Sequence, residues 1–214
     1  WFRIGDRDTA THLTRTNMLK NGKSLSDITK WMCEKFAIET KIIPVSDHSI
    51  ETRIQTDKGE LHLQEYWVKY RGKDTITGIE YVGSDKARPN PEALNAIHDS
   101  SLVIIAPGNP LTSIGPMIQL KGVRKELIKN KRKVVAVSPI VGDKAFSGPA
   151  GKYMEAAGLE VSAYGIAKLY ADICSHIVID TKDRMQTKKI EALGMHVHET
   201  SIKMNNKKSE DALA

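Results

Sequence analysis

The sequence predicts a doubly wound α/β fold with a mainly parallel sheet and an inserted smaller lobe. From residue 91 onward, short apolar strands alternate with amphipathic helices, which is typical of βαβ units. The runs SLVIIAPG (101–108) and KVVAVSP (133–139) are continuously apolar, as expected for parallel strands covered on both faces. Residues 50–68 instead alternate apolar and polar side chains around the turn DKG, which indicates an antiparallel hairpin.

The first part of the chain is predicted to be helical and then antiparallel. A helix over 8–22 ends at Gly22, and Ser24 caps a second helix over 24–36 with Asp27 at the capping-box position. Short strands are expected over 38–46 and 77–83, on either side of the hairpin. These elements divide the chain into a helical segment (1–37), an inserted antiparallel lobe (38–85) and the α/β core (86–214).

The core is predicted element by element from its hydrophobic periodicity. The strands at 101–108 and 133–139 are followed by two more, at 176–180 and 195–200. The helices are expected over 91–100, 115–130, 148–158, 163–174 and 183–194, and the chain turns helical again over 205–214.

Length and composition indicate a globular protein without a membrane-spanning segment. With 214 residues, 40% of them hydrophobic, the chain is long enough to bury a core, and 27% charged residues is close to the roughly 25% of ordinary globular proteins. No apolar run approaches the roughly 20 residues that a membrane span needs. Cys33 and Cys174 have no zinc-ligand spacing and are interpreted as reduced, packed thiols, so we expect a cytoplasmic protein with no membrane partner.

The net charge of +6 leaves nucleic-acid binding open as an alternative. The lysines are scattered, however, and the one compact basic run, KNKRKVV from Lys129, lies at a predicted helix C-terminus, where basic residues stabilise the helix dipole. A small phosphate-bearing ligand explains the moderate positive charge equally well. We therefore expect no nucleic-acid partner.

Two loops that follow predicted parallel strands form the candidate ligand site, since ligands bind beyond the carboxyl ends of such strands. The loop in 104–116, IIAPGNPLTSIGP, combines glycine with hydroxyls and free N–H groups before a helix, a combination that can bind phosphate. An ordinary βα loop would contain similar residues. The loop in 137–154 has the same character, and its Lys152 would either contact phosphate or be solvated. The candidate phosphate-binding residues are Gly108, Asn109, Pro110, Thr112, Ser113, Ser147 and Gly148.

The opening segment WFRIGDRD is a third candidate. If it is extended, the carboxylates of Asp6 and Asp8 point to one side of the backbone, where they could hold Mg²⁺ or accept a proton. Alternatively, Asp8 caps the helix that follows it. Arg3, beside Trp1 and Phe2, could clamp an aromatic polar ligand.

Several of these motifs occur in the same order in a known family. WFRIGDRDTATH, IIPVSDHSIETRIQT, APGNPLTSIGP and the stretch from VSPIVG to SGPAGKYMEAAGLEVSAYGIAKLY resemble the 2-phospho-L-lactate transferase family over essentially the whole chain. The resemblance implies a Rossmann-like core with an inserted lobe, dependence on Mg²⁺ and a homodimer. It also implies transfer of 2-phospholactate, or of a phosphoenolpyruvate equivalent, from a guanosine diphosphate-linked donor. The acceptor would be the ribityl hydroxyl of the deazaflavin FO (7,8-didemethyl-8-hydroxy-5-deazariboflavin), with release of GMP, in coenzyme F-420 biosynthesis.

The resemblance also assigns residues. Arg3 matches the basic position that contacts the deazaflavin, residues 108–113 match the second nucleotide-side loop, and Asp6 and Asp8 are matched by motif as catalytic candidates. Family members begin with a strand and a GGTG loop, followed by metal-binding aspartates, which do not occur here. We therefore expect a chain that lacks its first βα units and most of its metal ligands. A related possibility is a non-catalytic nucleotide-sugar-binding protein of the gluconeogenesis-factor type, which shares the core.

Overall fold

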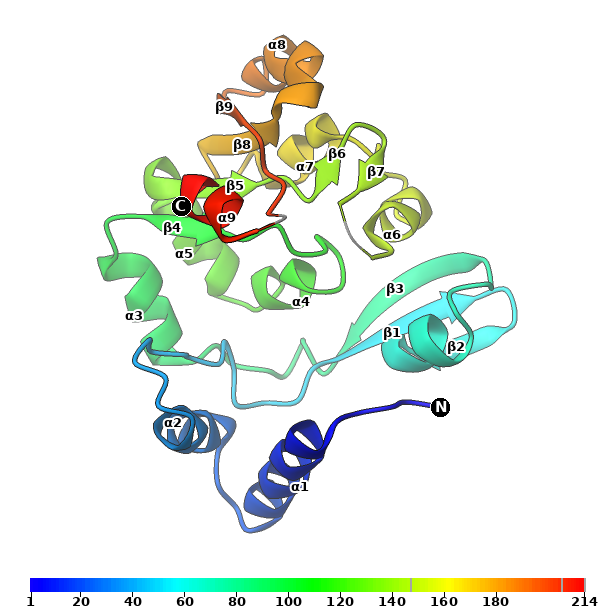
Figure 1. Ribbon diagram of the computed structural model, residues 1–214, viewed down its shortest axis with the longest axis vertical. Coiled ribbons are helices and arrows are strands. Elements are labelled where there is room, and N and C mark those ends of the chain that lie inside the picture. Colours follow the sequence, from blue (N-terminus) through cyan, green and yellow to red (C-terminus); the bar gives the residue numbers. More distant parts are fainter. Residues whose placement is uncertain (147, 205, 214) are drawn as a thin grey trace.

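The parallel sheet expected in the second half of the chain is present. The computed structural model describes residues 1–146, 148–204 and 206–213. The two inner strands of the sheet are residues 134–137 and 176–180, and side chains such as Val134 and Ile177 on them are completely buried. This burial explains why these strands are rich in apolar residues. The α/β fold class is therefore confirmed. The sheet has the order β4-β5-β8-β9 (Figure 1), formed by β4 (Val103–Ile105), β5 (Val134–Val137), β8 (His176–Asp180) and β9 (His196–Thr200).

Helices flank this sheet and complete the main core. The prediction of one helix over 115–130 is wrong, because the chain breaks into two helices at Gly122, whose φ of +107° favours glycine. The helices around the sheet are α3 (Pro91–Asp99), α4 (Ile114–Ile118), α5 (Val123–Lys129), α6 (Ala150–Ala156), α7 (Ala163–Tyr170) and α8 (Thr187–Glu191), with 3₁₀ segments η2 (Lys131–Lys133) and η3 (Thr181–Gln186).

A three-stranded antiparallel sheet forms the lobe beside the core (Figure 1). The predicted hairpin is confirmed, but its second strand ends at His62, and the next residues form a π-helix. The π-helix turns Tyr66 inward, where this side chain is completely buried and packs with Ile54, Ile76 and Tyr153. The elements of the lobe are β1 (Glu51–Thr56), β2 (Gly59–His62), η1 (Glu65–Lys69) and β3 (Ile76–Val82).

The N-terminal helices α1 (Asp6–Lys20) and α2 (Leu25–Lys35) pack on each other away from the parallel sheet (Figure 1). The Ser24–Asp27 capping box is confirmed, and Gly22 (φ +78°) ends α1 as predicted. The start of α1 differs from the expectation, because Gly5 is its N-cap and Asp8 already lies in its first turn. The strand expected over 38–46 is wrong, since this segment is irregular.

Two smaller features complete the chain. A short antiparallel ribbon, which sequence reasoning missed, joins β5 to α6, and the predicted C-terminal helix is present. These are β6 (Ile140–Val141), β7 (Lys144–Ala145) and α9 (Lys207–Leu213). Among the described residues, no helix has both the length and the apolar character that crossing a membrane requires.

Three histidines stack on one face of the parallel sheet. His176 on β8 lies 4.9 Å from the ring of His196 and 5.5 Å from that of His198, measured between ring centroids, and its Nδ1 is 3.2 Å from Nε2 of His198. Burial first, and the two neighbouring imidazoles second, hold the pKa of His176 below its usual 6.5. The folded protein therefore takes up a proton here less readily than the unfolded chain does.

This stack predicts a loss of stability in mild acid. The stabilisation is complete above about pH 6.5 and is lost as the pH falls toward the lowered pKa of His176, because the unfolded state binds protons first. We expect the urea midpoint of unfolding to fall between pH 7 and pH 5.5. His176→Phe retains an aromatic ring without a titrating group, so its midpoint should change less over this interval. Equal pH dependence in both proteins would contradict the prediction.

Candidate functional site

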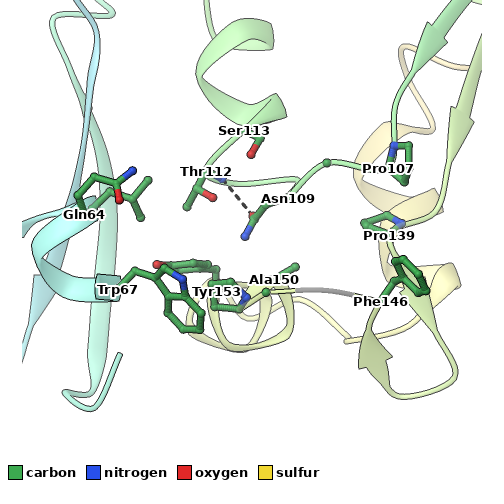
Figure 2. A pocket seen from close by; sticks show the side chains of 14 residues that line it. Gln64, Trp67, Pro107, Asn109, Thr112, Ser113, Pro139, Phe146, Ala150 and Tyr153 are labelled. Carbon is green, nitrogen blue, oxygen red and sulfur yellow. Dashed lines mark hydrogen bonds between the residues drawn. The ribbon is translucent and has the colours of Figure 1, made fainter. Parts of the chain in front are cut away.

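The loops that follow β4 and β5 meet in one cavity of about 290 Å³ at the carboxyl end of the parallel sheet. Figure 2 shows the first loop, with Asn109, Thr112 and Ser113, facing α6 and the lobe across this cavity. The sequence-based expectation that both loops share one crevice is therefore met. The lobe closes the third side through Leu63 and Gln64, which follow β2, and through Trp67 of η1. The cavity is lined by Leu63, Gln64, Trp67, Pro107, Gly108, Asn109, Thr112, Ser113, Pro139, Phe146, Gly148, Pro149, Ala150 and Tyr153.

Asn109 organises the first loop. Its side-chain oxygen accepts hydrogen bonds from the backbone N–H groups of Leu111 (3.0 Å) and Thr112 (3.1 Å), and its backbone oxygen accepts from those of Ser113 and Ile114. These four N–H groups are thus engaged within the loop, and α4 is only five residues long. The expected nest of free N–H groups at this helix start is therefore wrong.

The first loop presents neutral polar groups to the cavity. The Asn109 side-chain nitrogen points into the open space in Figure 2, and the hydroxyl groups of Thr112 and Ser113 lie beside it. Gly108 also lines the cavity, whereas Pro110 is buried under the loop and does not. Within the described ranges, no lysine, arginine, aspartate or glutamate lines this cavity.

The second loop contributes an apolar wall. Phe146, just after the β6–β7 ribbon, is 43% exposed at the cavity, and Gly148 and Pro149 continue the lining. Gly148 has a φ of +68°, which permits the turn into α6. The ribbon is anchored at its turn, where the Gly142 N–H donates to the buried carboxylate of Asp183 (3.0 Å). The predicted site residue Ser147 lies outside the described residues.

The lobe supplies the residues that sequence reasoning missed. Trp67 on η1 lines the cavity and is 42% exposed, while Tyr153 on α6 is 1% exposed and lies along its floor (Figure 2). Burial raises the pKa of the Tyr153 hydroxyl, and in the described part of the chain this hydroxyl has no hydrogen-bond partner. The sequence predicts a strand over 60–68, so the only sequence signal for Trp67 is its aromatic character.

Two side chains attach the lobe to the site. The hydroxyl of Tyr81 on β3 donates to the backbone oxygen of Leu111, and burial raises the pKa of Tyr81 to about 12. The Lys152 amino group on α6 donates to the backbone oxygens of Gly72 and Asp74 (3.3 Å to the latter). Neither of the two roles expected for Lys152, phosphate contact or solvation, is therefore correct.

The predicted residues of the opening segment do not line the cavity. Trp1 packs edge to face with Phe2 and lies 5.9 Å below the amino group of Lys69, which places this end of the chain against η1. Arg3 is exposed there. Because α1 begins at Asp6, this residue and Asp8 are two positions apart on a helix and point to nearly opposite sides of it, which corrects the expectation that both carboxylates point to one side.

The described residues contain no preformed cluster of metal ligands. Within those ranges, no group of three or more histidine, cysteine, aspartate or glutamate side chains is arranged to hold a metal ion. The cavity lining has no carboxylate, and both Asp6 and Asp8 are exposed on α1. The cysteines are free thiols, with Cys174 buried and Cys33 only partly so.

Comparison with known proteins decides the family. The family model described as 2-phospho-L-lactate transferase CofD matches residues 2–212. The chain belongs to this transferase family. Over 213 residues it is 42% identical to the 2-phospho-L-lactate transferase of Methanosarcina mazei, a match that covers 100% of this chain and 70% of the relative.

Two other relatives extend the comparison. The 2-phospho-L-lactate transferase of Methanocaldococcus jannaschii is 44% identical over 193 residues, covering 88% of this chain and 61% of the relative. The phosphoenolpyruvate transferase of Streptomyces griseus is 36% identical over 220 residues, covering 100% and 69%. This chain therefore spans between 61% and 70% of the length of these transferase-family members.

The fold also has a counterpart among solved structures. A UPF0052-family protein of Bacillus halodurans superposes with a TM-score of 0.61 at 15% sequence identity, covering 92% of this chain and 69% of that one. At this level of identity the likeness shows the shared fold alone.

Proposed function

We propose that this member of the 2-phospho-L-lactate transferase family transfers a phospholactyl or phosphoenolpyruvyl group. The donor is guanosine diphosphate-linked, the acceptor is the primary hydroxyl of the deazaflavin FO, and GMP is released in coenzyme F-420 biosynthesis. The observation that carries the proposal is the single cavity formed by the loops after β4 and β5, in a chain that matches the family model almost from end to end. One relative is named 2-phospho-L-lactate transferase and another phosphoenolpyruvate transferase, so the proposal includes both the phospholactyl and the phosphoenolpyruvyl donor.

The proposed reaction is one phosphoryl transfer. The acceptor hydroxyl loses its proton to solvent as its oxygen bonds to the β-phosphorus of the donor, the bond from that phosphorus to the bridging oxygen breaks, and GMP leaves with that oxygen. Alignment of the two substrates supplies much of the rate in reactions of this kind. Among the described residues, the loop ordered by Asn109 and the other residues that line the cavity would align the two substrates.

Three parts of the expected site stay predictions. Arg3, Trp1 and Phe2 are proposed acceptor contacts at the end of the chain that lies against η1. Asp6 and Asp8 remain proposed catalytic residues, although both are exposed and lie outside the cavity. Mg²⁺ dependence rests on the resemblance, and no step is derived through the metal.

The test is a direct assay of GMP release. The purified protein is incubated with FO and the guanosine diphosphate-linked phospholactate donor, or with its enolpyruvyl counterpart, in the presence and absence of Mg²⁺. We expect GMP to appear only when FO is present, together with an equal amount of deazaflavin that carries the phospholactyl or phosphoenolpyruvyl group. Release of GMP without FO would mean hydrolysis, and no release above background with either donor would refute the proposal.

A further inference from the structure

The β6–β7 ribbon carries one wall of the cavity but is too short to hold itself in place. Its strands pair at only two positions, Ile140 with Ala145 and Val141 with Lys144. Phe146 follows directly and faces the cavity (Figure 2). An isolated two-stranded hairpin is at best marginally stable in water, so this ribbon needs support from the rest of the fold. The position of Phe146 therefore depends on what holds the ribbon.

The ribbon is attached to the core at both ends. At the stem, Ile140 is completely buried, and the Phe146 N–H donates to the backbone oxygen of Pro139 (2.9 Å). At the turn, the Gly142 N–H donates to both carboxylate oxygens of Asp183, at 3.0 and 3.2 Å. Within the described ranges, no other side chain forms a hydrogen bond or an ion pair with this turn. The far end of the ribbon is therefore held by one carboxylate.

Asp183 lies on η3 and is itself held from the other side. Its carboxylate also accepts a hydrogen bond from the side-chain nitrogen of Gln186 (3.1 Å), and the residue is only 2% exposed. The side-chain oxygen of Gln186 in turn accepts from the backbone N–H of Tyr164 (2.8 Å), in the first turn of α7. Two side chains therefore connect the turn of the ribbon to a helix that packs in the main core.

The carboxylate at this position contributes direction more than stability. Among the described residues, no cation forms an ion pair with Asp183. Burial raises the pKa of Asp183, the hydrogen bond from Gly142 lowers it, and the charge of Asp180 raises it. Burying an unpaired carboxylate is unfavourable and offsets much of what its hydrogen bonds gain. These bonds still fix where the turn lies, because they weaken steeply when their geometry changes.

We propose that Asp183 is a positioning residue for the transfer reaction, which holds the turn of the β6–β7 ribbon and thereby keeps Phe146 in the cavity wall. The inference rests on the proposed function, because it needs a substrate that contacts Phe146. Asp183 is absent from the cavity lining, so it acts through the ribbon rather than on the substrate. Its removal should therefore weaken substrate binding without removing a group that takes part in the chemistry.

Substitutions at Asp183 separate its acceptor from its charge. Asp183→Ala removes the acceptor for Gly142, and we expect KM for at least one of the two substrates to rise about 5- to 10-fold, the usual effect of one lost hydrogen bond. The kcat should change little, because a wall contact is lost equally in the ground state and the transition state. Asp183→Asn retains a side-chain oxygen that can accept from both Gly142 and Gln186, so its KM should stay near that of wild type. Asp183→Leu, similar in shape but without an acceptor, should behave like Asp183→Ala and replaces it if the alanine variant does not fold.

Two comparisons show whether the effect passes through the ribbon. Asp180→Ala is the matched control, since Asp180 is also buried (3% exposed) but accepts from backbone N–H groups outside the ribbon. It should lower the melting temperature and leave KM unchanged. In a double-mutant cycle, Asp183→Ala should raise KM no further once Phe146→Ala has removed the wall side chain. Additive increases in the cycle, or an equal rise in KM for Asp180→Ala, would overturn the proposal.

Hydrogen exchange followed by mass spectrometry needs no turnover and keeps the two proposals apart. Asp183→Ala should speed exchange over residues 140–146 and leave that of β5 and β8 unchanged, whereas Asp183→Asn should exchange like wild type. If the wild-type protein releases no GMP, the proposed function fails, and the exchange result alone decides whether Asp183 holds the ribbon. If GMP is released but Asp183→Ala retains the wild-type KM for both substrates, or its ribbon exchanges as in wild type, the inference fails and the proposed function stands.

Discussion

Asn109→Ala is expected to lower kcat/KM for phosphoryl transfer about 100-fold. The substitution removes the acceptor for the N–H groups of Leu111 and Thr112, so the loop that faces the cavity loses its turn. Misplacement of a substrate by about 1 Å costs on the order of 100-fold in rate. The change is measured by GMP release at low concentrations of each substrate.

Two further variants separate the roles of Asn109. Asn109→Asp retains the side-chain acceptor and hence the loop, but it replaces the NH₂ donor with a negative charge facing the cavity. We expect its melting temperature to stay near that of wild type while substrate binding weakens. Asn130→Ala removes a comparable side-chain hydrogen bond, to the backbone oxygen of Glu126 (2.9 Å), at the end of α5 and outside the cavity lining. It should affect stability alone, and wild-type activity in Asn109→Ala would contradict the assigned role.

Gly165→Ala is expected to destabilise the fold by about 3 kcal/mol, the upper end of the usual cost of overpacking. A Cβ atom at this position of α7 would lie 1.9 Å from the backbone oxygen of Glu160 and 2.9 Å from its carbonyl carbon. These are backbone atoms, so the chain before α7 would have to move. Alanine otherwise favours a helix over glycine, so a loss of stability would isolate the steric clash. Urea unfolding monitored by circular dichroism measures it.

Gly78→Ala on β3 is the matched control. Its Cβ would meet the side chain of Gln55 at 3.6 Å, an ordinary contact, so we expect a change within about 0.5 kcal/mol. If Gly165→Ala proved as stable as this control, the close approach of Glu160 to α7 would not constrain the fold.

Local sequence signals predicted most of the elements. The strands β4, β5 and β8 could be predicted from their apolar runs, as expected for a parallel sheet covered by helices, whereas β9 (HVHET) followed from the alternation of strands and helices along the chain. The start of α2 followed from the Ser24–Asp27 pair, whose two hydrogen bonds lie within four residues. The hairpin of β1 and β2 followed from its turn and its alternation.

The failures share a cause, which is that a more distant part of the fold outweighed the local pattern. A strand was expected over 60–68 from the alternation at its start, yet the chain leaves the sheet after His62 and residues 65–69 form a π-helix, which places Tyr66 in the core of the lobe. The helix expected over 115–130 is interrupted at Gly122, where the chain turns before α5 packs against α3. The irregular segment 38–46 is apolar enough for a strand, but in the described part of the chain no strand pairs with it.

Only the part of the candidate site that follows from sheet topology could be predicted from the sequence. That the two loops share one cavity follows from topology, because parallel strands bring their carboxyl ends to one edge of a sheet. The opposite wall could not be predicted, since Trp67 and Tyr153 come from segments 86 residues apart whose meeting depends on how the lobe docks on α6. The sequence also could not predict that the Asn109 side chain accepts hydrogen bonds from the N–H groups of Leu111 and Thr112.

The α/β class, the family resemblance and the pair of loops that carry Gly108 and Gly148 could be predicted without a structure, because they depend on residue order and on short-range hydrogen bonding. The structure was needed to show that, among the described residues, no charged side chain lines the cavity and aromatic side chains bound it. It was also needed to show that Asp6 and Asp8 both lie on α1, outside the cavity. A cavity is made by side chains from separate elements, and their relative placement depends on packing across the whole core rather than on neighbours in the chain.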